Sequence, residues 1–296
     1  MNADVYFAMG KTHQVCQDYG LAGMTPPPMT PAIVLDGDVD SDSLRRTFAV
    51  VCDGCSSSPH TDVGARLLAH SVAWGFDTFK DDLRLSRAVW EAEELRHRMQ
   101  LPQQSLDATI MFLHETGDGH VRARVAGDGV VAGVRHDGVV VYWTIRYPSG
   151  APGYLSYLLS KDRYETYLDQ TGGGRMIAGS VLAPHEASDV WDEGDYAYDI
   201  MKLEDSEDFT WQKDFSRERF SMVVAMTDGV QSFQERDGPG FSPVPLEQVL
   251  GQVLGFKNLA GQFVSRRMRR FLGKYCRMNG WQHSDDVGVA AIHLEG

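Results

Sequence analysis

The chain alternates between short apolar runs and stretches in which apolar residues recur at helical spacing. Apolar runs rich in β-branched residues predict strands at residues 5–9, 32–35 and 47–52. A proline-rich stretch at 24–31 predicts a loop, because proline lacks a backbone donor and has a fixed φ. Helical periodicity then predicts helices at residues 63–76 and 82–99.

The middle of the chain consists of apolar runs separated by turn sequences. The runs predict strands at residues 108–114, 120–126, 130–135 and 139–143. Gly-Asp-Gly or Asp-Gly sequences lie between them, and such sequences are typical of hairpin turns. Because strands joined by tight turns pair antiparallel, this region is predicted to be an antiparallel meander.

Residues 144–221 have no clear period and are rich in glycine, tyrosine and acidic residues. We interpret this segment as an insertion or lid, with a short helix expected within 154–168. Beyond it the pattern predicts a strand at 222–226, helices at 246–254 and 259–278, and a closing strand at 287–293. Strands and helices mixed in this way predict an α+β fold with helix-covered sheets. The meander disfavours the alternative, a doubly wound parallel sheet.

The composition and net charge of the chain exclude several classes of protein. The chain has 296 residues, of which 43% are hydrophobic, and no linker marks a boundary, so residues 1–296 are expected to form a single domain. A formal charge of −13 argues against a nucleic-acid binder. No signal peptide or apolar run of membrane-spanning length is present, and the four cysteines are too few for a disulfide framework. We therefore expect a cytoplasmic protein without a membrane partner.

Charge is distributed unevenly along the chain. Residues 186–208 hold ten acids and one base, whereas residues 257–277 hold seven bases and no acid. We interpret the acidic stretch as a solvated loop. The arginines of the basic stretch alternate with apolar residues, as on any amphipathic helix, so a solvated helix face is the simplest interpretation.

Aspartates occur where several apolar strands end or begin. Asp53-Gly54 and Asp228-Gly229 end two of the strands, and Asp285-Asp286 precedes the last one. If these strand ends meet, the carboxylates repel one another and have raised pKa values unless a cation neutralises them. A hard divalent cation with oxygen ligands would do so.

Cysteine spacing offers a competing interpretation. Cys52 and Cys55 have the spacing of a zinc half-site or a redox pair, but Cys16 and Cys276 do not form a second pair. We favour a buried Cys52 on a strand and Cys55 in the following loop.

Five short motifs, taken in order, resemble the metal-dependent protein serine/threonine phosphatases, the type-2C or PPM phosphatases. The motifs are Cys16-Gln17-Asp18, Phe48 to Gly54, Val125 to Asp128, Ala225 to Gly229 and Ser284 to Val287. The segment from Gly10 to His13, together with Asp53 to Ser57 and Asp62 to Arg66, is similar to a bacterial subgroup of that family. The resemblance runs from about residue 10 to 294 and implies a four-layer α-β-β-α sandwich of two antiparallel sheets flanked by helices.

The resemblance also implies the residues of the active site. Asp53 would bridge two Mn²⁺ or Mg²⁺ ions, with the Gly54 carbonyl on one of them. Asp228 and Asp285 would complete the other, and Asp18 would hold a metal-bound water. Asp128 matches an accessory acid that can join Asp228 at a third ion. The implied reaction is attack of metal-activated water on a phosphomonoester.

Three positions depart from the family pattern. His13 stands where many members have a phosphate-gripping arginine, Gln17 replaces an acid, and Cys55 replaces a histidine proposed as general acid in eukaryotic members. The implied function is a phosphatase acting on phosphoserine or phosphothreonine of a protein, opposed by a kinase, with His13 contacting the phosphate. The alternative is a catalytically weak or inactive relative that senses phosphorylation or binds a partner.

Overall fold

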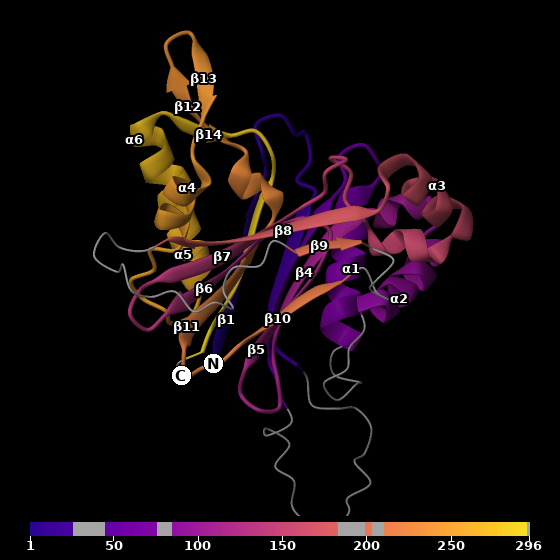
Figure 1. Ribbon diagram of the computed structural model, residues 1–296, viewed down its shortest axis with the longest axis horizontal. Coiled ribbons are helices and arrows are strands. Elements are labelled where there is room, and N and C mark those ends of the chain that lie inside the picture. The colour runs from indigo at the N-terminus through magenta and orange to yellow at the C-terminus, as the bar shows by residue number, and fades with distance from the viewer. Residues whose placement is uncertain (26–44, 76–84, 183–198, 203–209, 295–296) are drawn as a thin grey trace, which may run out of the picture.

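The structure is a computed structural model that describes the chain except residues 26–44, 76–84, 183–198, 203–209 and 295–296 (Figure 1). The strand expected at 32–35 lies outside the described residues, as do most of the proline-rich loop and most of the acidic stretch 186–208.

Strands of the described residues form three antiparallel sheets. A seven-stranded sheet has the order β1-β15-β11-β6-β7-β8-β9, a five-stranded sheet has the order β10-β5-β4-β3-β2, and a small sheet has the order β13-β12-β14. Their bounds are β1 Asn2–Ala8, β2 Asp18–Met24, β3 Thr47–Gly54, β4 Ala108–Glu115, β5 Val121–Ala126, β6 Gly129–Arg135, β7 Val140–Arg146, β8 Gly174–Leu182, β9 Asp199–Lys202, β10 Trp211–Phe215, β11 Phe220–Met226, β12 Phe233–Asp237, β13 Gly240–Pro243, β14 Trp281–His283 and β15 Val287–His293.

Helices cover both outer faces of the two large sheets. The α-helices are α1 Thr61–Gly75, α2 Leu85–Arg98, α3 Lys161–Thr171, α4 Leu246–Val253, α5 Phe263–Arg270 and α6 Arg277–Asn279. Shorter turns are η3 Gln103–Leu106, η4 Leu155–Leu159 and η6 Asp228–Gln231, and a π-helical turn, η7 Phe271–Cys276, joins α5 to α6. Helices α1 to α3 lie on one side and α4 to α6 on the other (Figure 1). Among the described residues, no helix has the length and apolarity needed to span a membrane.

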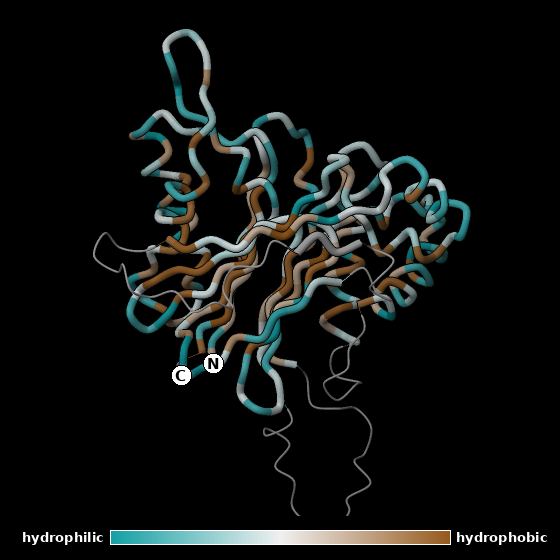
Figure 2. Tube along the Cα trace, viewed as in Figure 1, coloured by the Kyte–Doolittle hydropathy of each residue, from teal (hydrophilic) through white to brown (hydrophobic). Residues whose placement is uncertain are grey.

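Three buried apolar clusters separate the four layers. One lies between the five-stranded sheet and α1 and α2, one between the two large sheets, and one between the seven-stranded sheet and the helices α4 and α5. Apolar residues therefore follow the interior strands, while polar residues gather on the helices and loops (Figure 2). The predicted α-β-β-α sandwich of two antiparallel sheets is confirmed.

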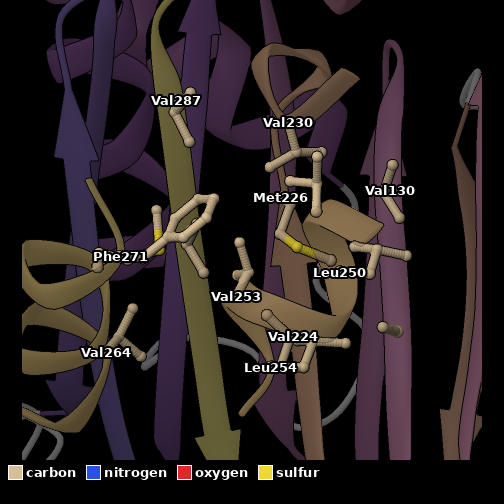
Figure 3. Close-up of a cluster of buried hydrophobic side chains, with 14 of the residues drawn as sticks. Val130, Val224, Met226, Val230, Leu250, Val253, Leu254, Val264, Phe271 and Val287 are labelled. Carbon is tan, nitrogen blue, oxygen red and sulfur yellow. The ribbon is translucent and has the colours of Figure 1, made fainter. Parts of the chain in front are cut away.

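Strand β3 illustrates why its sequence is apolar throughout. Successive side chains of a strand point to opposite faces, so Val50 and Cys52 pack against the helices while Ala49 and Val51 pack against the other sheet. On the far side of the sandwich, Val224 and Met226 of β11 meet Leu250 of α4 and Phe271 (Figure 3). Burial on both faces holds the strands that carry the candidate aspartates in fixed positions.

The predicted meander is wrong at one turn. β4 pairs with β5 and β6 pairs with β7, but β5 and β6 belong to different sheets. The Gly127-Asp128-Gly129 sequence is therefore a crossing between layers rather than a hairpin turn. Gly127 has a φ of 104°, and a Cβ there would lie 2.2 Å from Thr109 Oγ1, so both its conformation and its packing require glycine.

Several elements were not expected from the sequence. β2 and the small sheet were missed, as were strands β8 to β10 at the edges of both large sheets. The helix expected within 154–168 is present as η4 and α3. The other predicted elements within the described residues are present, with the helix expected at 259–278 beginning at Phe263. The role of 144–221 as an insertion or lid stays a prediction.

The packing of α1 on η3 yields a stability prediction. A Cβ at Gly64 would lie 1.6 Å from the Ser105 carbonyl oxygen. We expect Gly64→Ala to lower the free energy of unfolding by about 1–3 kcal/mol, because the backbone must shift. Chemical denaturation followed by circular dichroism measures this.

Gly251 is the matched control, because it lies in α4 and a Cβ added there would have nothing within 4 Å. Gly251→Ala should be neutral or stabilising by about 0.5–1 kcal/mol. Equal effects of the two substitutions would contradict the tight α1–η3 contact.

Candidate active site

Asp18 and Asp53 lie opposite each other in neighbouring strands. Asp18 begins β2, Asp53 is the penultimate residue of β3, and the two are direct partners in the antiparallel register. Like charges in directly opposed positions destabilise a sheet. Only 2% of Asp18 is exposed, so water screens this repulsion poorly.

Three further aspartates line one cavity of about 330 Å³. Asp128 lies at the crossing between β5 and β6, Asp228 begins η6 one residue after the end of β11, and Asp285 precedes β15. All three lie at strand ends, as the Asp-Gly and Asp-Asp patterns predicted for Asp228 and Asp285 and as the family resemblance implied for Asp128. The structure brings them together although they are far apart in the sequence.

Electrostatic coupling joins the cavity to the Asp18–Asp53 pair. Burial raises the pKa of Asp53 well above its usual range, and the charges of Asp18, Asp228, Asp285 and Asp128 raise it further. Burial likewise raises the pKa of Asp18. The pKa of Asp228 is raised to about 7 by burial and then by Asp128 and Asp285. The five predicted aspartates thus form one cluster of mutually repelling carboxylates.

Two threonines orient individual carboxylates of this cluster. Thr227 Oγ1 donates a hydrogen bond of 2.9 Å to Asp18 Oδ2 and accepts one of 2.8 Å from the Gly288 amide. Thr109 Oγ1 donates to Asp128 Oδ1 at 3.0 Å. In contrast, Asp18 Oδ1 and Asp228 Oδ1 are buried without a hydrogen-bond partner in the described part of the chain. These two oxygens are left for a ligand.

Hard oxygen donors of this kind are the ligands that Mg²⁺ and Mn²⁺ prefer. In their present positions, however, no three His, Cys, Asp or Glu side chains of the described residues converge to hold a metal ion. The chemistry of the donor set and the two unpartnered oxygens fit a divalent cation.

His13 lies beside the cluster rather than in the cavity. Its Nε2 is 3.3 Å from Asp285 Oδ1 and its Nδ1 is 3.1 Å from Asp286 Oδ1. Asp286 is 1% exposed and accepts hydrogen bonds from the amides of Gly10 at 2.6 Å and Gln17 at 2.5 Å. Asp286 therefore ties the loop before β2 to the last strand.

Asp286 belongs to one of the five sequence motifs, but no role was predicted for it. The adjacent pair Asp285-Asp286 contains no signal that tells which carboxylate faces the cavity and which is buried.

The end of β3 and the loop after it hold Gly54 and Cys55 at the positions that the sequence predicted. Gly54 ends the strand directly after Asp53, and its amide donates to the Gln17 carbonyl at 3.2 Å. All four cysteines are free, with Cys52 buried and Cys55 in the loop, where its Sγ is 3.0 Å from Ser57 Oγ. The burial of Cys52 on β3 and the position of Cys55 in the loop agree with the favoured interpretation of these two residues.

Arg146 and Tyr147 are functional candidates that sequence reasoning missed. Both line the cavity with Asp128, Asp228 and Asp285. Arg146 Nε donates to Gln231 Oε1 at 3.0 Å, and its Nη2 bonds the same oxygen. Tyr147 Oη is buried without a hydrogen-bond partner among the described residues. Arg146 is the last residue of β7, and its sequence neighbourhood contains no motif that would have singled it out.

The chain belongs to the protein phosphatase 2C family, because the sequence profile of that family matches residues 34–273. This confirms the family suggested by the five motifs. The matched residues include Asp53, Asp128 and Asp228, whereas Asp18 and Asp285 lie outside them. A comparison with curated proteins finds no match.

Solved structures of bacterial phosphatases are similar to this chain at low identity. The serine/threonine phosphatase Stp1 from Staphylococcus aureus is 11% identical, with 99% of this chain and 95% of that chain covered and a TM-score of 0.48. The serine/threonine phosphatase PstP/Ppp of Mycobacterium tuberculosis is 13% identical, with 100% and 99% covered and a TM-score of 0.47. The S. agalactiae serine/threonine phosphatase is 11% identical, with 99% of each chain covered and a TM-score of 0.48.

The raised carboxylate pKa values predict a pH-dependent stability of the metal-free protein. Asp228 has a pKa of about 7 in the folded chain, so folding keeps a proton that the unfolded chain releases near pH 4. The contribution of Asp228 to the free energy of unfolding should therefore be largest below about pH 4 and be lost as the pH rises from about 4 through about 7.

Asp228→Asn should flatten this decline and stabilise the metal-free protein at pH 8 by about 1 kcal/mol or more, since one pKa unit corresponds to about 1.4 kcal/mol. Urea denaturation between pH 5 and pH 8 in the presence of a chelator measures it. Asp169→Asn, at an exposed position of α3, is the control. A pH slope identical in all three proteins would contradict the coupling.

Proposed function

We propose that the protein is a metal-dependent protein serine/threonine phosphatase that hydrolyses phosphomonoesters. The observation that supports this most strongly is the cluster of five carboxylates from strand ends, Asp18, Asp53, Asp128, Asp228 and Asp285. Burial and mutual repulsion raise the pKa values of the first four. Divalent cations would neutralise this buried negative charge. Membership of the protein phosphatase 2C family supports the same reaction class.

The proposed cofactors are two Mn²⁺ or Mg²⁺ ions, with a third at an accessory position, as the family generally uses these metals. Asp53 would bind both ions and the Gly54 carbonyl one of them, Asp228 and Asp285 would complete the other, and Asp128 with Asp228 would hold the accessory ion. Asp18 would accept a hydrogen bond from a water in the site. When bound, such cations lower the pKa of water and neutralise phosphate charge.

Phosphate recognition requires positive side chains facing the cavity. The His13 ring lies beside the carboxylates of Asp285 and Asp286. Arg146 lines the cavity, and its guanidinium donates to a neutral amide oxygen, Gln231 Oε1. A guanidinium can present two parallel donors to phosphate oxygens, which imidazole cannot. We therefore assign phosphate contacts to Arg146 as well as to His13.

The proposed substrate is a phosphorylated protein of a pathway opposed by a serine/threonine kinase, in the cytoplasm. The alternative function, a catalytically weak relative that senses phosphorylation or binds a partner, has one observation in its favour. The described acidic side chains do not converge on a preformed metal position. Metal-dependent turnover separates these two functions.

Purified protein should hydrolyse p-nitrophenyl phosphate when Mn²⁺ is supplied, and a chelator should stop the reaction. Asp53→Asn and Asp228→Asn should reduce turnover to the level of the metal-free protein, because each removes a charged ligand. Asp169→Asn should leave turnover unchanged. If the wild-type protein shows no Mn²⁺-dependent turnover above the two site variants, the binding-module alternative replaces the enzyme.

Arg146→Ala should raise KM for p-nitrophenyl phosphate about tenfold or more and weaken inhibition by inorganic phosphate to the same extent, because a charged hydrogen bond contributes about 1.5–3 kcal/mol. Arg146→Lys should recover part of the loss. His13→Ala should raise KM more moderately. Steady-state kinetics with phosphate as product inhibitor provide both values.

Arg87→Ala, on the outer surface of α2, is the control for loss of one positive charge. If KM and phosphate inhibition are unchanged in Arg146→Ala or in His13→Ala, that residue does not contact the phosphate.

A further inference from the structure

The helix layer outside the seven-stranded sheet carries a concentrated positive surface on an acidic protein. We name it the basic helix surface and define it by the basic residues of α5, η7 and their flanks, Lys257, Arg266, Arg267, Arg269, Arg270, Lys274 and Arg277. The whole chain has a formal charge of −13. None of these seven side chains forms an ion pair with an acid in the part of the chain that the structure describes.

Two cavities open on this surface and share the guanidinium groups of Arg267 and Arg270. One, of about 260 Å³, is also lined by Lys274 and by the rings of Phe271 and Tyr275. The other, of about 460 Å³, is also lined by Phe256 and Lys257. Each cavity thus combines cationic groups with aromatic walls. The sequence favoured a solvated face of an amphipathic helix, and that interpretation does not account for the two cavities.

Arg267 is held in an electrostatically unfavourable position between the cavities. Its Nη2 bonds the Gln252 carbonyl, while its Nε is buried without a hydrogen-bond partner in the described residues. Burial and the nearby charge of Arg270 lower the pKa of Arg267. Carboxylates bound beside Arg267 and Arg270 would relieve this repulsion, and partial burial strengthens such a contact.

The basic helix surface is connected to the candidate site by packing. Phe271 contacts Phe233, with ring centroids 5.2 Å apart. Phe233 directly follows Ser232, which lines the cavity of the aspartates. A partner bound to α5 and η7 therefore occupies the layer that supports one wall of the site.

We propose that the basic helix surface docks an acidic segment of the phosphoprotein substrate, with apolar side chains of that segment in the two cavities. Identifying the docked partner as the substrate rests on the proposed phosphatase function. Aromatic walls beside arginines suit a peptide that carries both carboxylates and apolar side chains. Nucleic acid fits less well, because the net negative charge of the protein repels a long phosphate backbone.

The test compares an acidic phosphoprotein with a small substrate. Arg269 and Arg270 are both exposed, so the double variant Arg269→Glu, Arg270→Glu should fold normally. The value of kcat/KM for phosphorylated casein should fall about tenfold or more and depend less on salt, because complementary charges steer association. The value for p-nitrophenyl phosphate should stay unchanged.

The matched control is Arg87→Glu, Lys161→Glu, which makes the same charge change on α2 and α3, where each side chain pairs with a glutamate one turn away. It should leave both substrates unaffected. If the two double variants reduce casein turnover equally, or if neither does, the docking proposal is overturned.

Direct binding separates failure of docking from failure of the proposed function. Fluorescence anisotropy of labelled phosphocasein needs no turnover, and its affinity should fall in the Arg269→Glu, Arg270→Glu variant. Lost binding together with an absent wild-type activity would reject the phosphatase function but keep the docking surface. Unchanged binding in an active protein would reject docking. A labelled single-stranded DNA that binds more tightly than casein, and depends on the same arginines, would also overturn the proposal.

Discussion

Burial of the central strands on both faces is the constraint on which the acidic centre depends, because it holds mutually repelling carboxylates together. Asp18 and Asp53 face each other across two strands, and Asp128, Asp228 and Asp285 lie close enough to raise the pKa values of their neighbours. Left alone, such a cluster would separate or take up protons. The strands that carry it are packed on both faces, so the aspartates stay together.

Hydroxyl, carboxylate and guanidinium groups around the cluster each hold a different part of it. Threonines donate to single carboxylate oxygens, and Asp286 fixes the loop before β2 through two amides. Arg146 brings a guanidinium to the open side of the cavity. The unpartnered oxygens of Asp18 and Asp228 remain as the positions where positive charge is missing among the described residues. The geometry of the site and its excess of negative charge thus both favour a cationic ligand.

The hydrophobic pattern predicted an element correctly wherever the residues of that element show a clear apolar run or period. The apolar runs ending in Asp-Gly predicted β3, β11 and their aspartates, because burial on both faces leaves a continuous apolar strand. β2 was missed because its sequence DYGLAGM has two glycines and no clean alternation. Turn chemistry could not distinguish a hairpin from a crossing at Gly127 to Gly129, since both need positive φ. Arg146 lines the cavity only because distant strand ends meet there, and the sequence of no single segment predicts which strand ends meet.

The place of β15 in the large sheet has a consequence for how the molecule is made. β15 lies between β1 and β11, so β1 has no neighbour in its sheet until β15 has been synthesised. Asp285 and Asp286 arrive with that strand. During translation the nascent chain therefore exposes the edges of β1 and β11, and the acidic centre is completed only after β15 has emerged from the ribosome.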